Sequence, residues 1–297
     1  MKKRACGLLL LVSAQLVILP TVAANVFFKI EHQQHANAQP SYLLGTMHLL
    51  CENRFIMPKA VQDVTAAVDQ LIVEVDLTDA DELREAQQAS FQQPPNYLRN
   101  YLNVQAYNEL AEQTQQQLQI PLDALAPLRP MIISSLFLAN SLTCKGNTFS
   151  LDERLIMQAA ATNKTIVGLE TARWQLMLFD QIDLAQQVDA LFELVSNPNE
   201  TQRDLTRMAT IYMSGNGEKL HKELIAQDDF MGASALFLDD RNKTWVQQLP
   251  QLIATNSSLI AVGAGHLYGQ YGLLKLLADK GFEITPIPVR FDTVESH

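Results

Sequence analysis

The chain has 297 residues, of which 47% are hydrophobic, and it carries a formal net charge of −10. Its 12 glycines and 12 prolines are too few for a collagen-like or low-complexity protein, and its apolar content excludes a disordered chain. The length is ample for a hydrophobic core in one large domain or two small ones. Because non-specific nucleic-acid binding needs a basic surface, the acidic balance predicts no nucleic-acid partner.

Residues 1–24 have the pattern of a secretory signal peptide. The basic start Lys2-Lys3-Arg4 is followed by an apolar run over residues 7–19 and by small residues up to Ala24. The run is short for a membrane-spanning helix, and an uncleaved amino-terminal anchor is the alternative. No later segment is apolar enough to cross a membrane. We therefore expect cleavage after Ala24, a periplasmic or secreted protein, and a single domain over residues 25–297.

Export changes the meaning of the cysteines. Two remain after removal of the leader, Cys51 and Cys144. In an oxidising compartment such a pair can form a disulfide, and two buried free thiols are the alternative. Two cysteines so far apart are not a zinc-finger pattern, which needs close pairs. We expect a disulfide between Cys51 and Cys144.

Strands and helices alternate in the first half of the chain. The expected strands cover residues 26–31, 41–44, 71–77 and 164–169, and the first two form a hairpin. Helical spacing covers residues 60–68, 78–119 with a break at Pro94-Pro95, and 132–142. Ser150 and Glu153 form a capping box that begins a helix ending near residue 161.

The second half is mainly helical. Residues 171–249 are expected to be helix, with breaks at residues 197–198 and 214–217. A strand over 258–262, a helix over 267–280 that stops at Gly281, and a strand over 282–290 complete the chain. Strands separated by helices predict an α/β fold, with a mixed β-sheet flanked by helices and a large helical middle portion.

A short pattern occurs twice, in two weakly similar halves of the chain. YLLGTMHL covers residues 42–49, and IAVGAGHL covers residues 260–267. In each, an apolar strand is followed by G-x-x-H, with Gly45 and His48 in the first copy and Gly263 and His266 in the second. Open α/β sheets bind ligands at the carboxyl ends of their strands, so both histidines are expected in one cleft. Two hydrogen-bonded core histidines are the alternative.

Carboxylates occur in comparable places. Glu74 lies in the apolar run LIVEVDL with Asp76 two residues on, and period two puts both on one face of a strand. Glu170 follows the strand over 164–169. A buried ion pair with an arginine is the alternative for Glu74, and capping of the next helix is the alternative for Glu170. Histidine and glutamate together are suitable ligands for Mn, Co or Zn, although the chain has no H-E-x-x-H.

These segments resemble the TraB/GumN family, which includes the Tiki-like metalloproteases. The resemblance rests on SYLLGTMH, LIVEVDL, TIVGLET and LIAVGAGHLYGQYGLLKLLADKGFEI, and it covers almost all of the chain after the leader. It implies an active site with His48, His266 and Glu74. The E-R-N segment of the family is here Asp240-Arg241-Asn242, which keeps the arginine but changes the acid. Asp152 and Gln175 also match polar positions of the family.

Three functional hypotheses follow. The first is an exported metal-dependent hydrolase, a peptidase, in which His48, His266, Glu74 and Glu170 hold a divalent Mn, Co or Zn ion. Glu74 then acts as ligand or base, and Arg241 stabilises the tetrahedral intermediate. The second is a protein that binds or sequesters a peptide or small molecule in the same cleft without cleaving it. The third is a metal-free hydrolase with a His or Glu base, as in the distantly similar erythromycin esterases.

Overall fold

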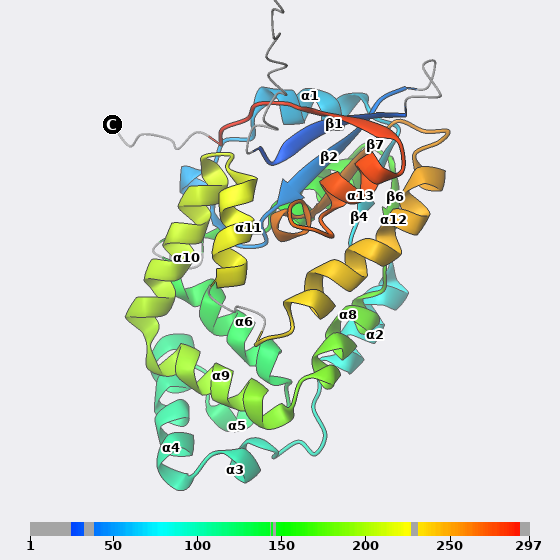
Figure 1. The fold of residues 1–297 in the computed structure, drawn as a ribbon. Helices are drawn as coiled ribbons and strands as arrows, with labels where there is room; N and C mark the ends of the chain where they lie inside the picture. Colours follow the sequence, from blue (N-terminus) through cyan, green and yellow to red (C-terminus); the bar gives the residue numbers. More distant parts are fainter. Residues whose placement is uncertain (1–24, 33–38, 143, 145–146, 227–230, 292–297) are drawn as a thin grey trace, which may run out of the picture.

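The computed structural model describes residues 25–32, 39–142, 144, 147–226 and 231–291, so the expected leader lies outside the described residues. A mixed sheet of six strands runs in the order β6-β4-β7-β2-β1-β8 (Figure 1). This confirms the predicted α/β class. The strands are β1 (Phe27–His32), β2 (Ser41–Thr46), β4 (Gln70–Val73), β6 (Thr165–Gly168), β7 (Ser258–Gly263) and β8 (Phe282–Pro286).

The interior of the sheet is parallel, and one edge is antiparallel. Strand β4 pairs in parallel with β6 and β7, and β7 pairs in parallel with β2. Strands β1 and β2 form the expected antiparallel hairpin, and β8 adds to the far side of β1. Every residue of β4 is buried, as are all but the last of β7. Apolar runs of this kind are typical of parallel strands that are covered on both faces.

Some helices cover the sheet, and others form a second, helical region next to it (Figure 1). Helix α7 contacts β4 and β6, and α13 contacts β8 and α12. Outside these contacts, α2 lies against α8, and α10 against α11. These helices are α1 (Lys59–Ala67), α2 (Ala80–Ala89), α7 (Leu151–Ala161), α8 (Ala172–Met177), α10 (Pro198–Met213), α11 (Gly217–Ala226), α12 (Asp240–Leu252) and α13 (Leu273–Asp279).

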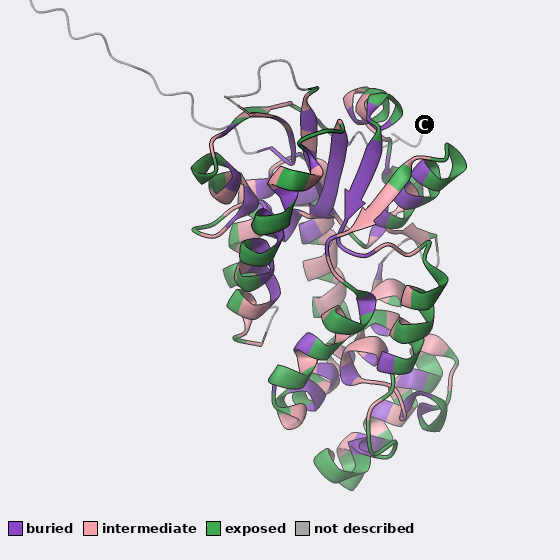
Figure 2. Cartoon of the chain, turned by 90° about the vertical axis from the view of Figure 1, so that its right-hand side faces the viewer, coloured by how far each residue is buried: buried purple, intermediate pink, exposed green. Residues whose placement is uncertain are grey.

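The helical middle portion has an apolar cluster of its own. Tyr97, Leu110, Phe137 and Leu191 are among its buried members, and it is distinct from the cluster that surrounds the sheet. Figure 2 shows the buried strands above and the partly buried helices of this portion below. The helices are α3 (Leu98–Tyr101), α4 (Val104–Gln113), α5 (Leu122–Leu125), α6 (Pro130–Ser141) and α9 (Leu184–Ser196). None of the helices among the described residues is long and apolar enough to span a bilayer.

Three predicted elements are too long. The strand expected over 71–77 ends at Val73, so Glu74 and Asp76 do not share a strand face. Asp76 instead accepts a hydrogen bond from the Thr78 amide (2.9 Å), as in a turn. The helix expected over 267–280 begins only at Leu273, because Gly269 takes a left-handed conformation (φ 98°) in the preceding turn. The last strand ends at Pro286 rather than residue 290.

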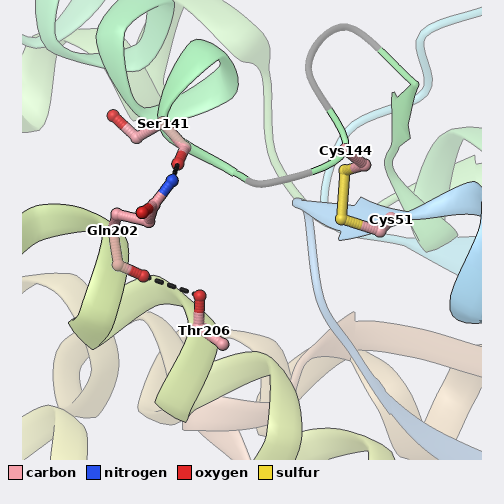
Figure 3. Close-up of a disulfide and its surroundings, with 5 residues drawn as sticks. All are labelled: Cys51, Ser141, Cys144, Gln202 and Thr206. Atoms are coloured by element: carbon pink, nitrogen blue, oxygen red, sulfur yellow. Dashed lines mark hydrogen bonds between the residues drawn. A yellow bond between two sulfur atoms is a disulfide. The ribbon is translucent and has the colours of Figure 1, made fainter. Parts of the chain in front are cut away.

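A disulfide joins Cys51 to Cys144, with the two Cα atoms 5.8 Å apart (Figure 3). Cys51 ends the short strand β3 (Leu50–Cys51), which pairs with β5 (Thr148–Phe149). Nearby, the side chain of Gln202 on α10 donates to the carbonyl of Ser141 on α6 (2.9 Å). The Cys51–Cys144 disulfide therefore fixes the segment that follows the first G-x-x-H motif.

Loss of this disulfide should destabilise the protein. Replacing both cysteines by Ala is expected to lower the free energy of unfolding by about 4 kcal/mol, because the bond restricts the unfolded chain across a separation of 93 residues. Denaturant unfolding of the chain from Asn25 onward, with and without reductant, measures the change. Reductant should lower the stability of the wild type only. Two thiols reactive under denaturing, non-reducing conditions contradict the prediction.

Candidate functional site

The carboxyl ends of the four parallel strands meet at one edge of the sheet, and the predicted site residues follow these ends. Glu74 comes directly after β4, and Glu170 lies two residues after β6. His48 lies two residues after β2, and His266 lies three residues after β7. The site is thus built from segments that are far apart in the sequence but adjacent in the sheet.

The glycines of the two motifs have different roles. A Cβ atom added at Gly45 would lie 2.6 Å from Leu267 Cδ1 and 2.9 Å from the Cα of Ala264, so glycine allows the two motifs to pack together. A Cβ atom at Gly263 would lie 3.3 Å from Glu74 Oε1, 3.7 Å from His266 Cδ2 and 3.8 Å from His48 Nε2. The missing side chain of Gly263 therefore leaves a space that both histidines and Glu74 border.

Arg241 lies at the centre of the buried part of the site. Its Nε and Nη2 donate to Glu170, and Nη2 also donates to Glu74. Its Nη1 donates to the carbonyl of Phe237 (3.0 Å) and to Nε2 of His266 (3.1 Å). These contacts use all the N–H donors of a guanidinium. No donor of Arg241 is left for a substrate in this arrangement.

His266 is held as a neutral imidazole. Asn242 donates from Nδ2 to the carbonyls of His266 (3.1 Å) and Tyr271 (2.9 Å), so its Oδ1 faces the ring. That oxygen lies 2.8 Å from His266 Nδ1, which must carry the proton. Nε2 then accepts from Arg241, which can only donate. Burial lowers the pKa of His266 to about 3, which keeps the ring uncharged at neutral pH.

The two acids of the buried site respond differently to their surroundings. Burial opposes ionisation of Glu74, but Arg241, the two neighbouring histidines and the N–H of Gly263 together outweigh it and hold the pKa of this carboxyl well below its usual range. Burial raises the pKa of Glu170, and Arg241 only partly compensates. Glu170 is further held by Gln175 (2.7 Å) and by the indole N–H of Trp245 (3.0 Å).

His48 has a different environment from His266. Its side chain is 66% exposed, and its Nδ1 lies 2.8 Å from Oδ2 of Asp152. Asp152 itself is buried and accepts from the hydroxyls of Thr46 (2.5 Å) and Ser150 (3.3 Å). The charge of Asp152 raises the pKa of His48 to about 9. This pairing directs Nε2 of His48 toward the space beside Gly263.

A half-open pocket of about 330 Å³ adjoins the exposed side of the site. His48, Glu74, Asp152 and Gln175 contribute polar atoms to it. The apolar part of its lining comes from β4, the residues that follow it, α7 and α8: Val73, Val75, Leu77, Ile156 and Ala172. A few convergent polar groups in a mostly apolar hollow are typical of a small-ligand site.

The expected metal ligands do not fit a metal ion in this arrangement. Glu74, Glu170 and His266 all direct acceptor atoms at Arg241, so the guanidinium fills the place where their lone pairs converge. Among the residues that the structure describes, no group of three or more His, Cys, Asp or Glu side chains is placed to hold a metal. Of the four expected ligands, His48 and Glu74 line the half-open pocket. The metal predicted from the sequence stays a prediction.

Several residues that hold the two histidines in place are not among the residues predicted to be catalytic or to bind a metal. Asn242 and Trp245 lie one and four residues after Arg241 on α12, and both are buried. Thr46 and Asp152 form the support of His48. The family resemblance contains Asn242 in the E-R-N segment and Asp152 at a polar position, but it assigns neither of them a role in orienting a histidine. Trp245 gives no signal of such a role, because an apolar helix position accounts for it.

Comparison with known proteins identifies the family. No match was found among the curated proteins or among the solved structures. The family model described as TraB/PrgY/gumN matches residues 26–286, which include both G-x-x-H motifs, Glu74, Glu170 and Arg241. The match covers most of the chain and confirms the resemblance drawn from its motifs. The protein therefore belongs to the TraB/PrgY/gumN family.

Proposed function

We propose that this protein is an exported hydrolase that cleaves a peptide substrate with a water molecule activated between His48 and Glu74. Family membership supports the general assignment, and the peptide class is what the resemblance of its motifs implies. The observation that carries the proposal is the space beside Gly263, which His48 Nε2 and Glu74 Oε1 border from two sides.

A water in this space would have partners for both of its protons. Ionised Glu74 accepts one hydrogen bond and orients the water, and neutral His48 accepts the second proton through Nε2. Glu74 is the weaker base because its pKa is lowered, whereas the raised pKa of His48 makes it the better proton acceptor. Asp152 binds Nδ1 and so fixes the orientation of the ring.

The reaction then follows general-base hydrolysis. The water oxygen attacks the carbonyl carbon of the substrate as its proton passes to His48 Nε2. The tetrahedral intermediate collapses, the carbon–nitrogen bond breaks, and His48 returns the proton to the leaving amine. Arg241 acts on this path indirectly, because its contacts fix Glu74 and His266. The apolar lining beside His48 suits an uncharged side chain of the substrate.

Filling the space at Gly263 should stop catalysis without unfolding the protein. Gly263→Ala is expected to lower kcat/KM by at least about 100-fold, because the new methyl group would displace the water between His48 and Glu74. Gly263 has φ −49° and ψ 134°, which alanine adopts without strain. Hydrolysis of a peptide library and thermal unfolding measure the two effects.

Gly265→Ala is the matched control. Its methyl group would meet the side chains of Leu224 and Leu238 and would not border His48 or Glu74. Activity should therefore survive in this variant. Full activity in Gly263→Ala would rule out a water at that position.

The pH dependence of hydrolysis should report the protonation of His48. Because His48 must be neutral to act as base, kcat/KM is expected to rise with pH up to about 9. Asp152→Asn removes the charge that raises this pKa, so the rising limb should move toward the ordinary value of 6.5. The maximal rate should fall, since the ring loses its ionic anchor. NMR titration of His48 checks the shift independently of turnover, and Asp63→Asn, on the exposed surface, should change neither. A rate that falls as pH rises toward 9 contradicts the base role.

Binding without cleavage is the alternative that the assay separates. A ligand that protects the protein against thermal unfolding, yet yields no product with the wild type at any pH between 6 and 10, would favour sequestration. Protection by the same peptide in Gly263→Ala would show that the pocket still binds when catalysis is lost.

Export is proposed from the leader and is supported by the Cys51–Cys144 disulfide, a bond typical of oxidising compartments. Asn25 follows the expected cleavage site, and its backbone N–H donates to the hydroxyl of Tyr268 (2.9 Å). Amino-terminal sequencing of periplasmic or secreted material is expected to begin at Asn25. A full-length chain retained in the cytoplasm with two free thiols at these positions would contradict both parts.

A further inference from the structure

We propose that Arg241 is the resident cation of the buried site, so that Glu74, Glu170 and His266 bind no divalent metal while Arg241 is in place. This inference does not depend on the hydrolysis proposal. It concerns only which positive charge the buried cluster holds, and it disagrees with the metal that the sequence motifs predict.

The acceptor atoms of the cluster are already in use. A metal at the cluster would need lone pairs of Glu74 Oε2, of Glu170 and of Nε2 of His266, and each of these atoms already accepts at least one hydrogen bond. Arg241 donates to all three side chains. The side-chain amide of Gln175 also donates to both carboxylates, to Glu74 (2.8 Å) and to Glu170 (2.7 Å).

The charge of the cluster also requires one cation. Glu74, Glu170 and Arg241 have side chains that are at most 10% exposed. Buried carboxylates without a counter-charge are costly, so the cluster requires a cation. A guanidinium and a divalent ion would both serve, but the two would repel each other at such short range. The cluster therefore accepts one or the other.

Arg241 is also held by contacts outside the cluster. The guanidinium carbon lies 4.7 Å from the ring centroid of Trp245, and Nη1 also donates to the carbonyl of Phe237, one turn earlier in the chain. If the side chain of Arg241 moved out of the cluster, it would lose these two contacts and its ion pairs with Glu74 and Glu170 at the same time. Metal binding through these ligands thus has to displace a firmly held group.

The test compares the wild type with Arg241→Met, which keeps an unbranched side chain and removes the charge. MnCl₂, CoCl₂ and ZnCl₂ are titrated into metal-free, untagged protein by calorimetry, and thermal unfolding is followed with and without each ion. Arg241→Met should have a lowered Tm without metal. It should gain one bound ion and a rise in Tm of roughly 5 to 10 °C at a metal concentration about 100 times Kd. The wild type should show no comparable rise.

Two further variants assign the ion to the cluster. Arg241→Met combined with Glu170→Gln should lose the gain in metal binding, because one ligand is removed. Arg203→Met, which alters an exposed arginine on α10, should behave as the wild type. If Arg241→Met does not fold without metal, refolding in the presence of an ion supports the proposal, and failure to fold with every ion contradicts it.

The wild type alone can also overturn the proposal. Stoichiometric metal binding by the wild type that is abolished by Glu170→Gln or by His266→Ala would show that the cluster holds a metal beside Arg241. Weak binding that neither substitution changes would come from other groups, such as the exposed His48, and would agree with the proposal.

Discussion

The buried guanidinium of Arg241 is the interaction on which the site depends. Three of the four strand ends at the carboxyl edge are followed by a buried polar side chain. Two of these are the carboxylates of Glu74 and Glu170, and the third is the imidazole of His266. A folded chain cannot leave two carboxylates there without a cation. Arg241 supplies it from α12, a helix that lies outside the sheet, and so ties that helix to the strand ends. The same contacts keep His266 neutral and Glu74 ionised, and the proposed hydrolysis uses the ionised form of Glu74 to orient the water.

The two motif histidines have opposite electrostatic environments although their sequences match. His266 is surrounded by Arg241, Asn242 and Trp245 and is held uncharged, whereas His48 faces solvent and is paired with Asp152. The two environments differ because a different helix packs against the end of each strand. Helix α12 covers the end of β7, while the first turn of α7 reaches the end of β2 with its acid. A repeated motif therefore yields one structural and one accessible imidazole.

Much of this arrangement could be predicted from the sequence, and the reasons are local. The apolar runs that end in glycine locate the strand ends that bear His48 and His266, and Glu74 and Glu170 are recognised as acids within or directly after two other apolar runs. The partners could not be located in this way. Whether Arg241 reaches Glu74 depends on the packing of α12. The strand over 71–77 appears longer than it is because Val75 and Leu77 continue an alternation of apolar and acidic residues after Val73. The sequence leaves a disulfide and two buried free thiols as alternatives, because the separation of two cysteines along the chain does not give the distance between them in space.

The order of the strands has a consequence for how the protein is made. Strand β7 lies between β4 and β2, yet it is synthesised long after both. Until it is inserted, β2 and β4 each expose an unpaired edge, and such edges pair readily with other chains. A chain that crosses a membrane from its amino terminus would carry these open edges until almost its whole length had emerged. The strand ends that bear His48 and Glu74 would then meet His266 only after β7 is inserted between β2 and β4.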